Sequence, residues 1–342
     1  MSEIIGAVKL EDKRMINGKS DVNQLVPFKY KWAWERYLAQ CNNHWSPTAV
    51  NMQRDIEQWK SDVLSDEERR IVIRNLSFFS TADSLAANNI VLGTYRQITA
   101  PEVRQYLLLQ AREEALHTHS YQYIIESIGL DETETFSAYL NIPSIKNKDE
   151  FLIPFINTLT DPNFKTGTIE NDQKLLTSLI VFACIMEGLF FYVGFVQILA
   201  LGRQNKMPGA AEQYQYILRD ESSHCNFGVD VINTIKLENP DLWTIDLQEK
   251  IYDLFRQAVK LEYEYAIDTM PNGVLGLNTE MFIQYLEFIA NRRLTQIGLN
   301  PIFDSNNNPF PWMSEIIDLP KEKNFFANRV TEYKTGAALS WD

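Results

Sequence analysis

The stretch REEALHTHSYQY, residues 112–123, decides the fold. Within it, Glu114 and His117 are three residues apart. On an α-helix this spacing places the two side chains on one face, about a turn apart. A carboxylate and an imidazole held together in this way are candidate ligands for one metal ion.

A second copy of this pattern lies in RDESSHCNFG, residues 219–228, where Glu221 and His224 have the same spacing. A single Glu-x-x-His pair is a weak signal, because chance matches are common on acidic helices. Two such pairs, with one carboxylate from each of two other helices, form the ligand set of a carboxylate-bridged dinuclear site in a four-helix bundle. The repeated motif therefore predicts an all-α protein.

Two acidic residues in apolar helical segments are the candidates for the remaining ligands. Asp83 lies in SFFSTADSLAANN, deep in a run without Gly or Pro that opens with a capping box at Ser65. Glu187 lies in IMEGLFFYVGF, within the apolar segment 175–202. Because a buried carboxylate is costly unless it is paired or binds a cation, both are predicted to bind metal. The alternative for Asp83 is a hydrogen bond to a neighbouring serine.

Helix start and stop signals divide the chain into three parts. Residues 1–24 are predicted to form an N-terminal arm, mobile or draped over the body; residues 25–320 the helical body; and residues 321–342 a flexible C-terminal tail. Helices are expected at 30–42, 65–92, 101–128, 175–202, 208–239, 244–270 and 279–297, with shorter helices around Pro143 and Pro154 and a loop at 300–320.

The composition excludes some classes of function. A formal net charge of −13 and a pI near 4.9 argue against a surface for nucleic acid, and no Gly-rich phosphate loop is present. Segment 175–202 could span a membrane, but its central Glu187 favours the core helix of a soluble bundle. The three cysteines lack metal-ligand spacing, and no signal peptide is evident, so we expect reduced thiols in a cytoplasmic protein.

The ligand types favour particular metals. Four carboxylates and two imidazoles suit iron or manganese, whereas zinc sites favour thiolates or a His-rich tetrahedral set. Four anionic ligands also roughly neutralise two divalent ions, which makes burial of the charges tolerable.

Tyr121 lies four residues after His117 and therefore on the same helix face. Helical spacing from the predicted ligands places Phe191, Phe195 and Ile217 near it, in a dry apolar pocket. A phenol in such a pocket beside an oxidising metal pair is a candidate radical site, because the apolar wall protects a radical from quenching. The alternative is an ordinary core tyrosine.

Asp220 and Trp45 are candidates for a path that leads away from the metals. Asp220 precedes Glu221 and could accept hydrogen bonds from both His117 and an indole N–H. Trp45 follows a predicted break at 44–47 that places it at the head of the next helix, and its alternative role is that of a packed aromatic residue. His119 points to a different side of its helix and is not assigned to the site.

Taken together, the sequence resembles the small, radical-generating subunit of class I ribonucleotide reductase over nearly its whole length. The matching stretches are STADSL, EEALHTHSY, MEGLFFYVGF, RDESSH, NPFPWM and RVTEYKTGAALSWD. The resemblance implies a ferritin-like bundle with extra helices, a homodimer, and a C-terminal tail that docks on a large catalytic subunit. Together the subunits would act as a ribonucleoside-diphosphate reductase, forming deoxyribonucleotides for DNA replication.

The resemblance also assigns roles to individual residues. The family's metal ligands fall on Asp83, Glu114, His117, Glu187, Glu221 and His224. Its radical tyrosine falls on Tyr121, and its relay residues fall on Trp45, Asp220 and, in the tail, Tyr333. The small subunit is expected to build an oxidising centre and pass the oxidising equivalent to the large subunit.

The resemblance does not determine which metals the site binds. Members that use a manganese–iron centre have Phe at the radical position and Glu as the first ligand, whereas this chain has Tyr121 and Asp83. Two iron ions with a tyrosyl radical are therefore the first choice, and a manganese–iron or dimanganese centre, with or without a radical on Tyr121, is the alternative. Arg112 stands where many members have an apolar residue, and its charge is expected to affect access of water or oxidant.

Two other functions fit parts of the pattern. A ferritin-like dimetal oxidase or oxygenase acting on a small molecule or lipid would share the six ligands but would not need Trp45, Asp220 or an aromatic tail. An iron-storage or structural bundle would need a cage-forming subunit, and such chains are usually shorter.

Overall fold

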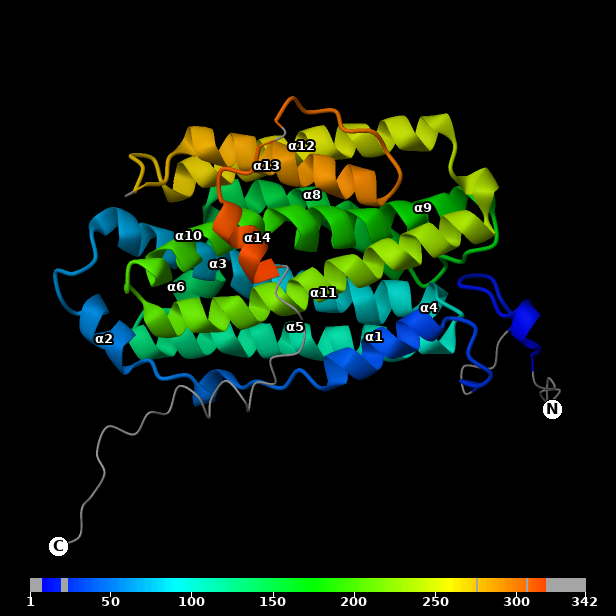
Figure 1. The fold of residues 1–342 in the computed structure, drawn as a ribbon, viewed down its shortest axis with the longest axis horizontal. Helices are drawn as coiled ribbons and strands as arrows, with labels where there is room; N and C mark the ends of the chain where they lie inside the picture. The colour runs from blue at the N-terminus through cyan, green and yellow to red at the C-terminus, as the bar shows by residue number, and fades with distance from the viewer. Residues whose placement is uncertain (1–7, 20–23, 275, 306, 318–342) are drawn as a thin grey trace, which may run out of the picture.

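The chain folds into a bundle of long helices that run roughly side by side (Figure 1). The computed structural model describes residues 8–19, 24–274, 276–305 and 307–317. Within these ranges the only structure besides helices and turns is two isolated β-bridges. The predicted all-α class is therefore confirmed.

The elements follow one another in a simple order. They are η1 (Leu10–Asp12), α1 (Lys31–Cys41), η2 (Pro47–Ala49), α2 (Gln53–Trp59), α3 (Asp66–Asn88), η3 (Asn89–Thr94), α4 (Tyr95–Gln97), α5 (Pro101–Ile128), α6 (Glu132–Phe136), α7 (Ala138–Asn141), α8 (Pro143–Thr160), α9 (Ile169–Ile180), η4 (Val181–Phe190), α10 (Tyr192–Arg203), α11 (Pro208–Glu238), η5 (Pro240–Leu242), α12 (Ile245–Thr269), α13 (Thr279–Gln296) and α14 (Pro311–Ile317). In Figure 1, α12 and α13 lie along one side of the bundle and α1 and α5 along the opposite side.

Helix α3 begins with the predicted capping box. The Ser65 hydroxyl accepts from the Glu68 N–H at 3.2 Å, and the Glu68 carboxylate accepts from the Ser65 N–H at 2.9 Å. The helix does not end at Leu92 as predicted, because its backbone continues through the π-helical turn η3 into α4. Gly93 lies in this turn, where a Cβ would come within 2.8 Å of the Leu159 side chain. Because Gly93 has no side chain, α8 can pack closely against this turn.

The two helices that carry the repeated motif begin and end where the sequence predicts. Both α5 and α11 have proline in the first turn. Helix α5 stops at Gly129, whose φ of 77° is the left-handed conformation that glycine adopts most easily. At 28 and 31 residues, these helices are long enough to hold the motifs deep inside the bundle.

The apolar segment is a core helix. It forms α9, η4 and α10, and 94% of its most apolar window, of mean hydropathy 2.3, is buried inside the protein. It is also the one helix in the described residues that is long and apolar enough to cross a membrane. Its central part, η4, is π-helical and holds more residues per turn than an α-helix, so the side-chain spacing around Glu187 is not α-helical.

Two predicted segments differ in the structure. The shorter helices expected around Pro143 and Pro154 form one helix, α8, which continues through Pro154. The carbonyl that has no helical hydrogen bond because of Pro154 can bond to water instead, since this part of the helix is exposed. The predicted loop 300–320 contains the short helix α14. Just before it, Phe310 is buried, with its ring 5.3 Å from that of Phe282 and 5.1 Å from that of Tyr285. These contacts with α13 fix the segment, and local sequence does not reveal them.

The described part of the N-terminal arm lies against the body. The Lys13 ammonium is buried and donates to the Leu25 carbonyl at 2.9 Å and to the Glu102 carboxylate at 3.4 Å. The Met15 N–H donates to the Glu238 carboxylate at 2.8 Å. These bonds connect the arm to α5 and α11.

A buried ion pair joins α8 to α12. Lys148 and Glu262 are fully buried with their charged groups in direct contact. The Lys148 ammonium also donates to the Phe190 carbonyl at 2.9 Å, at the end of η4, and Glu262 accepts from the Val193 N–H at 3.3 Å. Burial lowers the pKa of Lys148 to about 8 and raises the pKa of Glu262 to about 7, so each charge depends on its partner.

We predict that Lys148→Met lowers the free energy of unfolding by about 3–5 kcal/mol, because Glu262 is left buried without its cation. The double variant Lys148→Met/Glu262→Leu should recover at least half of that loss. Lys146→Met, which removes the exposed ion pair with Glu150, is the control and should change little. Urea denaturation followed by circular dichroism measures all three. If Lys148→Met unfolded at the wild-type urea concentration, the pair would have no stabilising role.

Candidate metal centre

Four helical segments bring the six predicted ligands to the centre of the bundle. Helix α3 packs against α5, and η4 packs against α11. None of the six side chains is more than 3% exposed. They are Asp83 from α3, Glu114 and His117 from α5, Glu187 from η4, and Glu221 and His224 from α11.

The six side chains form two overlapping groups. The first contains Asp83, Glu114, His117 and Glu221, and the second contains Glu114, Glu187, Glu221 and His224. In each group, one possible ligand atom per residue lies within 4.8 Å of all the others. Glu114 and Glu221 belong to both groups, so each could offer one oxygen to each of two ions. This arrangement is what two bridging carboxylates require.

The shared carboxylates lie between the two imidazoles. The Glu221 oxygens are 3.0 Å from His117 Nδ1 and 3.4 Å from His224 Nδ1. The Glu114 oxygens are 3.7 Å and 3.1 Å from the same two nitrogens. The imidazole ring centroids are 6.1 Å apart. Both Nδ1 atoms therefore face the space between the carboxylates.

Seven of the atoms that face this space have no hydrogen-bond partner within the described part of the chain. They are Asp83 Oδ1, both carboxylate oxygens of Glu114 and of Glu221, and the Nδ1 atoms of His117 and His224. Buried polar atoms are normally paired, so this concentration of unpaired acceptors indicates that another group satisfies them. Four carboxylates and two imidazoles without thiolate suit iron or manganese. The residues present therefore fit a dinuclear metal centre.

The electrostatics of the cluster favour positive charge. Burial raises the pKa of Asp83 to about 8. Burial, with the charge of Glu221 beside it, also raises the pKa of Glu187 well above its ordinary value. Burial alone would lower the pKa of His117, but the surrounding carboxylates, Asp220 first among them, outweigh it and raise that pKa well above 6.5. A site that attracts protons this strongly also attracts metal ions, which compete for the same atoms.

Each imidazole is held from outside by a second carboxylate. His117 Nε2 is 3.1 Å from Asp220 Oδ2, and His224 Nε2 is 2.8 Å from Glu113 Oε2. These bonds fix each ring with Nδ1 toward the space between the shared carboxylates. The sequence indicated Asp220 but not Glu113. A signal was present, because each shared Glu is directly preceded by an acid, in E-E-x-x-H and D-E-x-x-H.

Gln40 joins the two outer carboxylates. Its side-chain amide, on α1, donates to Glu113 Oε1 at 3.0 Å and to Asp220 Oδ1 at 3.1 Å. The Asn43 amide contacts the same oxygen of Asp220. Neither amide was predicted, because the contacts depend on how α1 packs against α5 and α11.

Trp45 lies beside His117. Its indole N–H donates to Asp220 Oδ2 at 2.9 Å, and the centroids of the Trp45 and His117 rings are 6.1 Å apart, in a stacked arrangement. Asp220 therefore accepts from the indole on the same oxygen that faces the imidazole. Trp45 is not at the head of a long helix, since it is followed only by the short η2.

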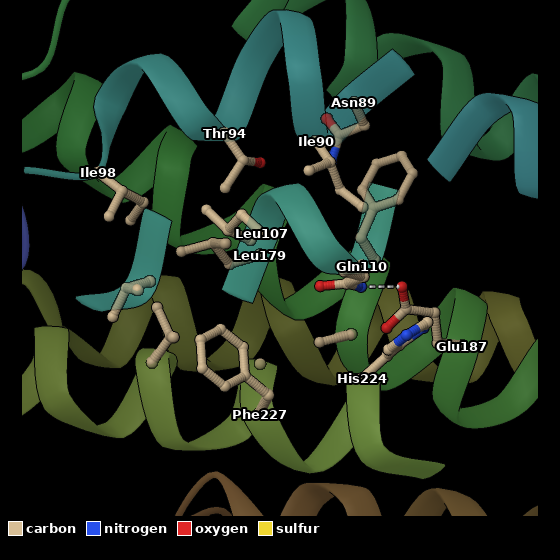
Figure 2. Close-up of a pocket in the computed structure, with 15 residues that line it drawn as sticks. Asn89, Ile90, Thr94, Ile98, Leu107, Gln110, Leu179, Glu187, His224 and Phe227 are labelled. Carbon is tan, nitrogen blue, oxygen red and sulfur yellow. Dashed lines mark hydrogen bonds between the residues drawn. The ribbon is translucent and has the colours of Figure 1, made fainter. Parts of the chain in front are cut away.

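A further partner orients Glu187. The Gln110 amide donates to Glu187 Oε1 at 2.7 Å, as the dashed line in Figure 2 shows. Gln110 comes from α5, one turn before Glu114. The sequence alone does not single it out, because a glutamine on a helix is usually a surface residue.

Tyr121 lies at the other end of the cluster. It is fully buried, and its hydroxyl donates to Asp83 Oδ2 at 3.0 Å. Burial, followed by the charge of Asp83, raises the pKa of Tyr121 well above 10.0. The phenol is thus held in its protonated form against a predicted metal ligand.

The aromatic neighbours of Tyr121 differ in part from those expected. Ring centroids of Phe79 and Tyr214 lie 5.6 and 5.9 Å from the centroid of Tyr121. Phe191 and Phe195 pack in turn against Phe79, at 4.9 and 5.3 Å. They belong to the same aromatic cluster, and Phe79 and Tyr214 are the direct neighbours that the spacing rules did not identify.

Of three further residues considered from the sequence, the two that the structure describes, Arg112 and His119, are not part of this cluster. Tyr333 lies outside the residues that the structure describes. Arg112 is exposed on α5, so its charge faces solvent and the expected effect on access to the site has no support. His119 is exposed as well, in agreement with its omission from the ligand set.

Residues 22–309 match the family model of the ribonucleotide reductase small chain. The β subunit of ribonucleoside-diphosphate reductase from Chlamydia pneumoniae is 58% identical over 335 residues, which are 98% of this chain and 96% of that protein.

Solved structures show the same likeness. The ribonucleotide reductase R2 subunit from Clostridium botulinum has a TM-score of 0.81 at 29% identity, over 89% of this chain and 94% of that one. A ribonucleotide reductase homodimer from Saccharomyces cerevisiae has a TM-score of 0.69 at 20% identity, over 90% of this chain and 88% of that one, which supports the fold alone. The matched length, the paired Glu-x-x-His motifs and the ferritin-like bundle together show that this chain belongs to the small-chain family of ribonucleotide reductases.

Proposed function

We propose that this chain holds a dinuclear metal centre on the six ligands described above and delivers an oxidising equivalent to a ribonucleotide reductase large subunit. The observation that carries the proposal is the pair of overlapping ligand groups that share Glu114 and Glu221. They occur in a chain 58% identical to a ribonucleoside-diphosphate reductase β subunit. The metal ions, when bound, supply the redox chemistry. The chain holds them in position, excludes water from the site and controls the movement of protons.

The identity of the metals is proposed from the ligand set. Two iron ions are our first choice, with a manganese–iron or dimanganese centre as the alternatives. All three fit a site of carboxylates and imidazoles. Metal analysis of protein isolated from its native cell, combined with electron paramagnetic resonance (EPR), distinguishes them.

Tyr121 is proposed as the residue that is oxidised. A phenol that loses an electron becomes strongly acidic and must also lose its proton. The hydrogen bond from the Tyr121 hydroxyl to Asp83 Oδ2, at 3.0 Å, gives that proton an acceptor. The surrounding aromatic rings exclude water, which would protect the radical.

Trp45, Asp220 and His117 are proposed as the start of the relay to the large subunit. The indole and the imidazole are hydrogen-bonded to the same Asp220 oxygen, so a proton can move along the contact as an electron passes. Tyr333 in the C-terminal tail is proposed as the last member on this chain. Its role rests on sequence, because the tail lies outside the described residues.

The assembly is proposed to be a homodimer that binds the large subunit through residues 321–342. The membership of this chain in the family of small chains supports this arrangement. The net charge of −13 offers no nucleic-acid surface, and the apolar helix is already buried in the core. We therefore place the chain in the cytoplasm, without a nucleic-acid or membrane partner.

The shared ligands give a first prediction. Glu221→Ala removes a ligand from both groups, so metal content after reconstitution should fall below one ion per chain. Glu187→Ala removes a ligand from only one group and should retain one ion. Glu126→Ala, at an exposed position on α5, is the control and should bind as wild type. Elemental analysis after dialysis measures all three. Two ions bound at native affinity by Glu221→Ala would refute the ligand assignment.

Tyr121→Phe tests the radical site. The ring remains and one buried hydrogen bond is lost, so stability should fall by only about 1 kcal/mol and metal content should not change. The organic radical signal in EPR should disappear, whereas Tyr214→Phe, the control at the neighbouring ring, should keep it. A signal that persisted unchanged in Tyr121→Phe would place the radical elsewhere. If wild type shows no organic radical and still supports nucleotide reduction, the oxidising equivalent resides at the metals.

The tail can be tested separately from the metal centre. Deleting the residues after Thr335 should abolish binding to the large subunit and leave metal content unchanged, because aromatic anchors of the tail supply most of the affinity. Tyr333→Phe should keep most of the binding and lose turnover. A peptide of residues 321–342 should compete with the whole chain in a binding assay. Full nucleotide reduction by Tyr333→Phe with the cognate large subunit would remove Tyr333 from the relay.

A further inference from the structure

An apolar cavity of about 40 Å³ lies beside one end of the ligand cluster. It is bordered by the π-helical segments η3 and η4 and by α5 and α11. Most of its wall is hydrocarbon, from Val103, Leu107, Leu179, Phe182, Phe227 and Val231. A cavity of this size holds a molecule of a few heavy atoms and is far too small for a nucleotide or a lipid.

The inner end of the cavity is formed by predicted metal ligands. In Figure 2, Gln110, Glu187 and His224 lie together on one side of the view and Ile98 lies on the other, with Leu107 and Phe227 between them. Glu187 and His224 belong to only one of the two ligand groups. A molecule in the cavity therefore meets that metal position first, on the side away from Asp83 and Tyr121.

The two π-helical segments explain why a gap exists here. A π turn is wider than an α turn, and such turns are frequent at functional sites. Asn89, Ile90 and Thr94 of η3 and Phe182 and Ala183 of η4 all line the cavity. Asn89 is only 2% exposed, and its side-chain oxygen has no hydrogen-bond partner in the described part of the chain.

The wall selects by charge. Moving an anion into an apolar cavity costs its hydration, and the buried carboxylates beyond would repel it as well. A small uncharged molecule meets neither barrier. Water is a poor permanent occupant, because it needs two to four polar partners and the wall offers few.

We propose that this cavity is the access route by which a small uncharged oxidant, dioxygen or hydrogen peroxide, reaches the metal position held by Glu187 and His224. This inference rests on the proposed function. It assigns the oxidant to one end of the centre and the oxidised tyrosine to the other. It also excludes superoxide, which is an anion, from this route.

Xenon tests the cavity without any metal. Crystals of the metal-free chain under xenon pressure should show xenon between Leu107, Leu179 and Phe227, because dry apolar cavities bind this gas. Leu179→Phe should fill the space and abolish the xenon site. Leu254→Phe is the matched control, since Leu254 on α12 is also 8% exposed and does not line the cavity. It should leave the xenon site intact. A wild-type crystal without xenon at this place would contradict the proposal.

Stopped-flow kinetics of the iron(II)-loaded chain test the route. Leu179→Phe should take up metal normally and react with dioxygen or peroxide more slowly, by roughly tenfold or more, as expected for a blocked channel. Leu254→Phe should react as wild type. If Leu179→Phe folds poorly, Val231→Leu adds a single methylene to the same wall and should slow the reaction in the same direction.

The possible failures are distinct. A chain that takes up no metal contradicts the proposed function. A chain that takes up metal and reacts at the wild-type rate with both neutral oxidants in Leu179→Phe and Val231→Leu contradicts the access route alone. The access route would also be overturned if these variants reacted more slowly with superoxide but at the wild-type rate with dioxygen and hydrogen peroxide.

Discussion

The structure depends on the burial of like charges at its centre. Four carboxylates meet among four helical segments, and two more, Glu113 and Asp220, stand directly behind the imidazoles. Such a concentration of negative charge is tolerable in a protein interior only when cations balance it. The long helices, the outer hydrogen bonds and the aromatic packing hold these groups in one geometry. The proposed affinity for metal ions is therefore a property of the whole bundle, because no single helix contributes more than two of the six predicted ligands.

The two ends of the ligand cluster have different surroundings. At the Asp83 end, the first neighbours are a phenol, an outer carboxylate and an indole. At the Glu187 end, the first neighbours are an amide and an apolar cavity. One end is thus suited to the departure of an electron and a proton, and the other to the arrival of a small neutral molecule. We propose from this packing that the arrival of the oxidant and the departure of the electron and proton take place at opposite ends, where they do not interfere with each other.

The sequence predicted the features that depend on local spacing. Glu-x-x-His pairs, the capping box at Ser65 and the Pro and Gly signals of α5 act within a few residues, so they can be recognised in one dimension. The features it missed depend on tertiary contact. Gln40, Glu113 and Gln110 acquire their roles from the helices they face. The rings next to Tyr121, Phe79 and Tyr214, also depend on how the helices pack, so spacing along one helix does not identify them.

The amide of Gln40 has a consequence for the order in which the protein opens. It bonds to both outer carboxylates, one on α5 and one on α11, from a helix near the beginning of the chain. If α1 detached, two buried acids would lose a donor at the same moment, so its local unfolding is coupled to the stability of the core. A peripheral helix would ordinarily fray first and often. Here it should instead belong to the same cooperative unit as the centre, and release of metal to a chelator should proceed at the pace at which α1 opens.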